Sequence, residues 1–382
     1  MAVAAPIPLS QAAARRIWLH AQRLDTAAPF GEGPTATPAA VRHLGYVQID
    51  TINVVERCHH QILYTRIPSY RRDDLRQAQS VEKSVFEYWT HALSYVPVED
   101  MRFFVRAMKR EADTRSSFFH TVTRGDLQKV LGRIRRNGAL TIRDIDDDVL
   151  QEKDHEWASR KPSKRALQLA FYRGVLTVSA REGMLKTYDL TTRHFGWDRL
   201  PQAAPAGEQI DYLLDRALRS QGVVSLDSIC HLDAPRKAAI ARLIHSRVRR
   251  KTLVPVALDG ARHEHWVAPE LLEAPFEPVD GIVHILNPFD PLIIQRKRLQ
   301  AFFGYEHRFE AYVPKEKRRY GYFAQPVLVG DAIPAVLDLK TDRERGKLLI
   351  QKWTWLHRQG RAALRQRIEE ELHRFERFQL AR

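Results

Sequence analysis

Cysteine is scarce in this sequence, and long apolar runs are missing. The chain has two cysteines, Cys58 and Cys230, which lie far apart in the sequence. This scarcity excludes a disulfide framework and a cysteine-rich zinc site, and it favours a reducing, cytoplasmic compartment. No apolar stretch approaches the roughly 18 residues of a membrane-spanning helix, and residues 1–10 carry no basic residue before their small apolar run. We therefore expect neither secretion nor a membrane partner.

Several motifs of common enzymes are also absent. The sequence holds no glycine-rich phosphate loop, no Gly-x-Ser-x-Gly motif and no dinucleotide-binding fingerprint, so ATP hydrolysis, acyl transfer and hydride transfer have no support. Asp144 with residues 146–148 suggests a divalent-metal nuclease, but one local acidic run is more typical of an exposed loop. The adjacent His59 and His60 point apart in a helix, and residues 263–265 lack a thiolate partner, so we expect no metal.

Acidic residues are outnumbered in this chain. Asp and Glu total 46 against 61 Lys and Arg, which gives a formal net charge of +15 and a pI near 9.9. Such an excess, spread along the whole length, favours a polyanion partner such as nucleic acid, and an ordinary basic soluble protein is the alternative. With 382 residues, 44% of them hydrophobic, the chain can bury the cores of about two to four domains.

An internal repeat occupies the middle of the chain. Residues 137–145 match residues 221–229, and Thr141 or Ser225 is placed to cap a short helix in each copy. Each match follows a helix and precedes a basic helix and two apolar alternating runs around a glycine turn. Three helices followed by a β-hairpin describe a winged helix. The opening region fits the same order with a longer insertion, so the sequence predicts three winged helices in tandem.

The chain changes character after residue 281, where short strands separated by turn residues predict a small β-barrel or a strongly curved sheet. We expect these strands near residues 309–313, 320–328 and 335–339, and helix from residue 347 onward. The fold class is therefore α+β. The predicted domains are winged helix 1 (1–120), winged helix 2 (121–205), winged helix 3 (206–275), a β-barrel-like domain (276–345) and a C-terminal helical segment (346–382).

Basic side chains gather on the third helices of the predicted winged helices, which are the elements that usually enter a DNA groove. The candidate phosphate contacts are Lys164, Arg165, Arg236 and Lys237 on these helices, and Lys317, Arg318 and Arg319 in a basic turn. Each one alone is more often a solvated surface charge. Their concentration on corresponding elements favours duplex DNA as the partner.

A short motif in the first predicted domain carries the candidate chemistry. If Val47 and Ile49 are buried in an extended segment, alternation places Gln48 and Asp50 together on the opposite face. An amide and a carboxylate side by side can hold a water molecule, and the carboxylate can act as a base or stabilise a developing positive charge. An ordinary exposed strand end is the alternative, because the spacing alone is common.

Four stretches together resemble a known family. They are LGYVQIDTINVVER (44–57), EYWTH (87–91), LNPFDP (286–291) and YVPKEKRRYGY (312–322). In combination they resemble the winged-helix DNA glycosylases of the YcaQ and AlkZ type. The resemblance implies a bacterial repair enzyme with three tandem winged helices and a C-terminal β-barrel that form a basic concave surface.

The same resemblance implies the substrate class and the site. Members of the family excise alkylated purines and unhook DNA interstrand crosslinks, with a catalytic pattern of Gln, an apolar residue, then Gln or Asp. That pattern falls on Gln48 and Asp50. Members devoted to resistance against one natural-product toxin usually have Gln at the second position, so Asp50 indicates the general YcaQ-like branch.

The expected protein is thus a glycosylase for N7-alkylated or crosslinked purines in duplex DNA. No lysine lies beside the motif to form a Schiff base, so we expect a monofunctional enzyme without lyase activity. No metal or nucleotide cofactor is required, and a single concave site makes a monomer the simpler expectation. The alternative is a non-catalytic winged-helix DNA-binding protein such as a transcriptional regulator, because a fold does not fix a function.

Overall fold

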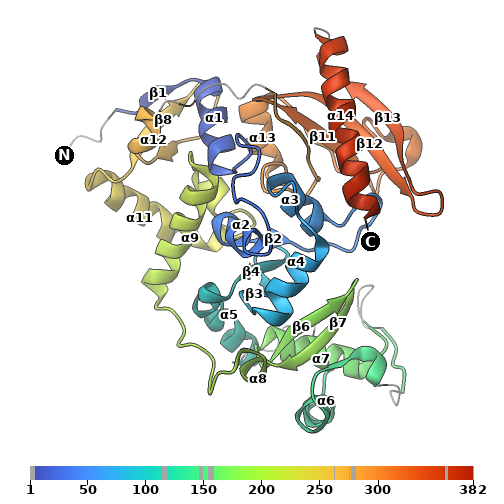
Figure 1. Cartoon of the computed structure of the whole chain (residues 1–382). Helices are drawn as coiled ribbons and strands as arrows, with labels where there is room; N and C mark the ends of the chain where they lie inside the picture. Colours follow the sequence, from blue (N-terminus) through green and yellow to red (C-terminus); the bar gives the residue numbers. More distant parts are fainter. Residues whose placement is uncertain are drawn as a thin grey trace. The chain divides into compact units, whose positions relative to one another are not determined.

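The computed structural model describes residues 5–113, 119–145, 149–153, 159–261, 263–274, 276, 281–357 and 360–381. The chain forms two compact units, one made of Met1–Arg72 with Ile210–Arg382 and the other of Asp73–Gln209. The first unit thus unites the blue N-terminal helices and the orange-to-red C-terminal elements of Figure 1.

The N-terminal part of the first unit is mainly helical. It comprises β1 (Ile7–Leu9), α1 (Gln11–Ala21), α2 (Ala36–Leu44), β2 (Val47–Gln48) and α3 (Cys58–Arg66). Ser10 caps α1 by accepting a backbone N–H at 3.2 Å, and Gly45 ends α2 in a left-handed conformation. Helix α3 begins at Cys58, with Arg57 as its N-cap.

The second unit combines helices with small antiparallel sheets. Its elements are α4 (Arg72–Arg76), a π-helix (Gln77–Val81), β3 (Val85–Trp89), β4 (Leu93–Pro97), a 3₁₀ turn (Val98–Asp100), α5 (Met101–Asp113), α6 (Arg124–Asn137), β5 (Leu140–Thr141), a 3₁₀ turn (Ile142–Asp144), α7 (Pro162–Tyr172), β6 (Leu176–Glu182), β7 (Leu185–Leu190) and α8 (Thr191–Phe195). Strands β3 and β4 pair antiparallel, and β5, β7 and β6 form a sheet in that order.

The second copy of the repeat has the same order of elements. It comprises α9 (Ala206–Gln221), α10 (Leu226–Ile229), a 3₁₀ turn (Ala234–Arg236), α11 (Lys237–Arg249), β8 (Val254–Leu258) and β9 (His265–Val267), with β1 parallel to β8. Thr141 and Ser225 both form capping boxes, as predicted. The residue before each cap pairs with the second strand of its hairpin, Leu140 with Tyr188 and Val224 with Trp266. The assignment of three tandem winged helices, with its domain boundaries, stays a prediction.

The C-terminal strands form an open sheet. Strands β10 (Val283–Ile285), β11 (Ala324–Val329), β12 (Ala332–Asp342) and β13 (Lys347–Trp355) are antiparallel in that order, and α12 (Glu270–Glu273), α13 (Arg296–Phe303), a 3₁₀ turn (Lys315–Lys317) and α14 (Arg361–Leu380) complete the region. The predicted closed barrel is wrong. Residues 309–313 form no strand, and among the described residues β10 and β13 remain the two edges of a sheet with too few strands to close.

The prediction of helix from residue 347 onward is wrong for β13 and correct for α14. Trp353 pairs with Leu337 of β12, and bulky side chains such as Ile350 suit a strand that has a long partner. Helix α14 packs against β10 and β13, as Figure 1 shows for the red helix across the sheet. The main apolar core of this unit joins α1 to α13, where the Trp18 and Phe302 rings meet edge to face at 5.1 Å.

Candidate active site

The candidate motif follows α2 through a tight backbone turn. Gly45 has a φ of 78°, and its N–H donates to the Val41 carbonyl at 2.8 Å. A side chain at this position would collide with Arg216, whose guanidinium lies 5.7 Å from the centre of the Tyr46 ring. The backbone conformation and the close approach of Arg216 therefore both require glycine where the chain enters β2.

Gln48 and Asp50 lie in different environments. Val47 and Ile49 are buried, as alternation predicts, but Gln48 is buried as well, with 5% exposure, and Asp50 is half-buried. Neither polar side chain is therefore fully exposed, and β2 ends at Gln48, so the strand itself does not extend to Asp50. That the two side chains lie on one face stays a prediction.

The Asp50 carboxylate is held by one oxygen only. Its Oδ1 accepts the Ile52 backbone N–H at 2.8 Å, which fixes the side chain at the start of the following turn. Its Oδ2 has no hydrogen-bond partner within the described part of the chain. A half-buried carboxylate with one fixed and one open oxygen is suited to accept a proton from water or to lie beside a cationic centre.

Cys58 connects the two candidate residues. Its Sγ donates to the Gln48 carbonyl oxygen at 3.0 Å. Burial, followed by the nearby Asp50 carboxylate, raises the pKa of Cys58 well above its ordinary value, so the side chain stays a neutral thiol. In the sequence, Cys58 was treated only as one of two isolated cysteines and was not connected with Gln48 or Asp50. Its position at the start of the helix that follows the motif could have indicated that contact.

Arg343, which follows β12, holds the turn between Asp50 and α3 in place. Arg343 donates to the Asn53 side-chain oxygen at 2.8 Å and to the Val55 carbonyl at 3.0 Å. Glu56 is buried and accepts from the Arg72 Nε at 3.1 Å. These bonds hold the backbone that carries Asp50 in one conformation.

Helix α3 is anchored by the 286–291 stretch. Both Arg66 and Asp290 have fully buried side chains, and the guanidinium donates to both carboxylate oxygens, at 2.8 and 3.1 Å. Asn287 donates to the Gln61 side-chain oxygen at 2.8 Å, also in the interior. The LNPFDP stretch therefore supports the helix behind the motif rather than presenting reactive groups.

The 87–91 stretch also contains a buried ion pair. The Glu87 carboxylate accepts from the Arg181 Nε and Nη2 at 2.5 and 2.7 Å and from Gln79 at 2.9 Å. Burial raises the pKa of Glu87, but the Arg181 charge and these hydrogen bonds outweigh it and leave the pKa below its ordinary value. Glu87 is thus a structural carboxylate of the second unit, whereas Trp89 is 40% exposed.

The predicted phosphate contacts differ in exposure. Lys164 and Lys317 are exposed, and Arg319 is exposed while it pairs with Glu306 at 3.4 Å. Arg165 is only 4% exposed, because it lies on the inward face of α7, and it is therefore withdrawn as a phosphate contact.

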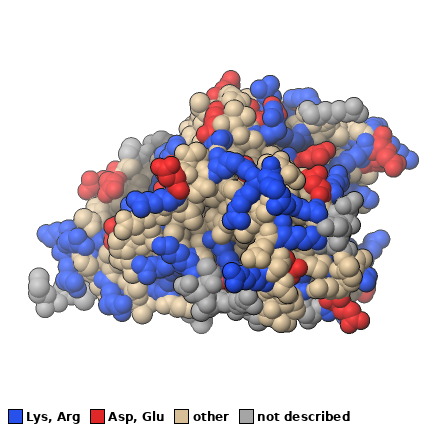
Figure 2. All heavy atoms as spheres, turned by 90° about the horizontal axis from the view of Figure 1, so that it is seen from below, with Lys and Arg blue, Asp and Glu red and all other residues tan. Residues whose placement is uncertain are grey.

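The remaining three cations are engaged locally. Arg236 and Lys237 form ion pairs with Asp233 and Asp227, and the Arg318 Nε donates to a backbone carbonyl at 2.7 Å. Lys164 belongs to the second unit, and the other exposed candidates belong to the first. Lys and Arg side chains clearly outnumber Asp and Glu on the face that Figure 2 shows.

Asp144, the one described residue of the acidic run, has a structural role. The Asp144 carboxylate accepts the Thr141 backbone N–H at 2.6 Å as part of a helix cap, and Asp146, Asp147 and Asp148 lie outside the described residues. Across the described ranges, no group of three or more His, Cys, Asp or Glu is arranged to hold a metal ion. No helix in those ranges is long and apolar enough to cross a membrane.

Comparisons with known proteins identify the fold and the family. The structure is similar to Streptomyces sahachiroi DNA glycosylase AlkZ with a TM-score of 0.63 and 15% sequence identity, over 98% of this chain and 97% of that one. At that identity the likeness shows a shared mixed α+β fold. The model of the family DNA glycosylase AlkZ-like matches residues 41–378, a range that contains the motif, its anchoring stretch and most of α14. The chain therefore belongs to the AlkZ-like DNA glycosylases.

Proposed function

We propose that this DNA glycosylase hydrolyses the N-glycosidic bond of N7-alkylated purines and unhooks interstrand crosslinks formed through such purines. The observation that supports this most is the state of Asp50, which is half-buried, fixed through Oδ1 and open at Oδ2. The carboxylate would stabilise the oxocarbenium-like sugar and accept a proton from the attacking water. Gln48 would orient the water or the sugar from its buried position.

The chemistry of the proposed substrate requires few catalytic groups, which agrees with a site of only Asp50 and Gln48. A purine alkylated at N7 already carries positive charge, so its glycosidic bond is weakened and the leaving group needs little acid catalysis. What remains is to stabilise positive charge on the sugar. A carboxylate about 4 Å from that charge contributes roughly 4 kcal/mol at an effective dielectric of 20. That energy corresponds to about a thousandfold in rate.

The proposed reaction ends at the abasic site. A lyase step needs an amine that attacks the sugar carbon, and residues 44–57 contain no lysine. We therefore propose a monofunctional enzyme that acts on duplex DNA as a monomer and needs no metal. A crosslinked base cannot leave the duplex completely, so the site would reach the sugar without a deep base pocket.

The test is base release from duplexes that carry N7-methylguanine or a nitrogen-mustard crosslink, in the presence of EDTA. We expect free alkylguanine and intact abasic strands from the wild type, a loss of at least tenfold in Asp50→Asn, and a smaller loss in Gln48→Ala. Asp198→Asn, an identical change at an exposed position, serves as the control. Absence of release by folded, DNA-binding wild type would overturn the proposed substrate class, and strand breaks without alkali would overturn the monofunctional assignment.

A further inference from the structure

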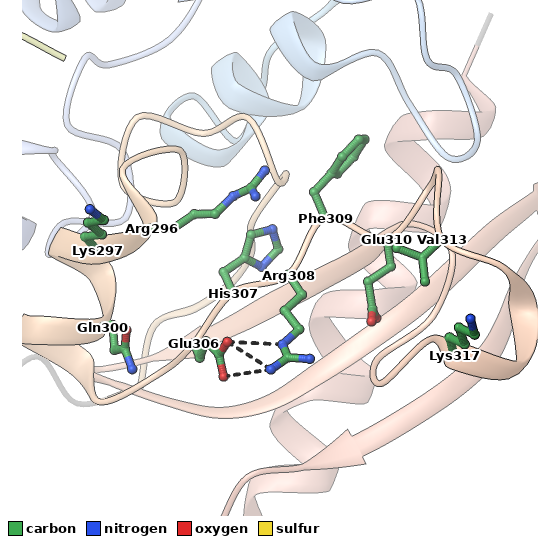
Figure 3. Close-up of a pocket in the computed structure, with 10 residues that line it drawn as sticks. All are labelled: Arg296, Lys297, Gln300, Glu306, His307, Arg308, Phe309, Glu310, Val313 and Lys317. Carbon is green, nitrogen blue, oxygen red and sulfur yellow. Dashed lines mark hydrogen bonds and ion pairs between the residues drawn. The ribbon is translucent and has the colours of Figure 1, made fainter. Parts of the chain in front are cut away.

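A basic pocket lies beside α13 in the first unit, and the glycosylase chemistry proposed above makes no use of it. It has a volume of about 470 Å³, within the roughly 300–1,000 Å³ of ligand pockets. The first turn of α13 forms one wall, with Arg296 and Lys297, and the segment from Glu306 to Lys317 forms the other. Figure 3 shows the side chains of both walls around this space.

The two acidic side chains of the pocket, Glu306 and Glu310, have bonding partners within the protein. Glu306 pairs with Arg308 at 3.0 Å and with Arg319 at 3.4 Å. The Glu310 carboxylate accepts three backbone N–H groups, from residues 319, 320 and 321, at 2.7, 2.7 and 3.2 Å. Both acids are thus bonded to groups other than the cations of α13 and Lys317, and the lining holds four basic side chains against these two acids.

Three cations of the lining have no bonded acid. The side chains of Arg296, Lys297 and Lys317 are exposed and make no hydrogen bond or ion pair with any residue that the structure describes, although the charge of Lys297 helps to lower the pKa of Asp227. Arg296 and Lys297 also lie in the first turn of an eight-residue helix, whose free N–H groups add positive potential. The pocket consequently attracts an anion.

A buried histidine of the lining, His307, has an unpaired ring nitrogen, which also indicates a ligand in this pocket. His307 lines the pocket with 3% exposure, its Nδ1 lies 3.0 Å from the Tyr305 hydroxyl, and its Nε2 has no partner among the described residues. Burial, followed by the Arg296 charge, lowers the pKa of His307 to about 3, so the ring is neutral at physiological pH. If the Tyr305 hydroxyl donates to Nδ1, Nε2 carries the proton and can donate to an anionic oxygen.

We propose that this pocket binds one backbone phosphate of the DNA strand, with Arg296 and Lys317 contacting its oxygens and His307 Nε2 donating the third bond. The proposal rests on DNA as the substrate, which the family gives, and does not depend on the excision chemistry of Gln48 and Asp50. A mononucleotide could supply the same phosphate chemistry. We favour the strand because both walls are open to solvent at exposed cations.

The pocket is connected to the candidate active site through packed side chains of the same unit. Phe309 of its lining packs on Phe289 with ring centres 5.2 Å apart, and Phe289 belongs to the stretch that anchors α3 through Asn287 and Asp290. A phosphate held here would fix the position of the strand relative to Asp50.

The test measures binding of a short undamaged duplex between about 50 and 200 mM salt, where each neutralised phosphate contributes about 0.9 to the slope of log affinity against log salt. We expect Arg296→Gln with Lys317→Gln to weaken binding about tenfold and to lower the slope by about 0.9, because both cations share one phosphate. Arg345→Gln with Lys347→Gln removes the same number of positive charges from an exposed turn and should leave the slope unchanged. Thermal unfolding of each variant confirms that it is folded.

His307→Phe provides a test without a change of charge. It should weaken binding several-fold with an unchanged slope, and this effect should vanish in the Arg296→Gln, Lys317→Gln background, because the phosphate is no longer held. A slope that falls by about 1.8, or does not fall at all, would overturn the single-phosphate pocket. Displacement of the duplex from wild type by micromolar dGMP, lost in the pocket variants, would assign the pocket to a free nucleotide instead. Because no base release is measured, a failure of the proposed excision chemistry leaves these outcomes unaffected.

Discussion

Two aspartates, Asp50 and Asp290, occur in stretches that both suggested this family, yet their surroundings differ. The Asp290 side chain is fully buried, and Arg66 donates to both of its oxygens. Asp50 is half-buried, accepts one backbone N–H and keeps its other oxygen open. A short motif that identifies a family can thus either stabilise the fold, as at Asp290, or form the candidate active site, as at Asp50. The hydrogen-bond partners of its carboxylate distinguish the two.

The largest expected effect is on stability, at Asp290. Asp290→Asn leaves the Arg66 guanidinium buried without its counter-charge, which should lower the free energy of unfolding by about 3 to 5 kcal/mol. Urea unfolding of variant and wild type measures this loss. Arg66→Met combined with Asp290→Leu should recover part of it, because no unpaired charge remains. A double variant as unstable as the single one would show that shape, not charge, governs this site.

Asp50→Asn should separate activity from stability. Loss of the charge beside the sugar should lower the rate of base release by up to about a thousandfold, or roughly 4 kcal/mol of barrier. The free energy of unfolding should change by less than about 1 kcal/mol, because the Asn oxygen can still accept the Ile52 N–H. Single-turnover base release and urea unfolding on the same preparation check both parts. A variant that loses stability in proportion to activity would make Asp50 another scaffold residue.

Local features of the sequence were predicted well, and non-local ones were not. The caps at Thr141 and Ser225 depend on hydrogen bonds within a few residues, so the local sequence is enough to predict them. Strand β13 depends on a partner strand, β12, and its residues alone also fit a helix. The environment of Asp50 likewise depends on the end of β2 at Gln48 and on the bond from Cys58 to the Gln48 carbonyl. The alternation of apolar and polar residues predicts neither.

Glu371 in α14 extends the comparison to a buried carboxylate with weaker compensation. It is 6% exposed, and burial raises the pKa of Glu371 to about 7, although its ion pair with Arg374 opposes the shift. A raised folded-state pKa means that the native state binds the proton more tightly, so stability should fall as the pH rises from about 4.5 to 7.

Glu371→Gln should remove that decline and raise stability near pH 8 by up to about 3 kcal/mol relative to wild type. Urea unfolding at several pH values measures it. Glu370→Gln, at an exposed position of the same helix, is the matched control and should keep the wild-type pH dependence. An equal decline in Glu371→Gln would assign the effect to another group.

The smallest effect is expected at Glu306, an exposed acid at the pocket beside α13. Its ion pairs with Arg308 and Arg319 are exposed to water on both sides, so Glu306→Gln should change the free energy of unfolding by at most about 1 kcal/mol. Removal of this negative charge leaves the pocket more positive. Duplex affinity at low salt should therefore rise by about two- to fivefold, the opposite sign from every cation variant. Fluorescence anisotropy measures it, and a loss of affinity in Glu306→Gln would mean that Glu306 orders the two arginines for DNA rather than opposing it.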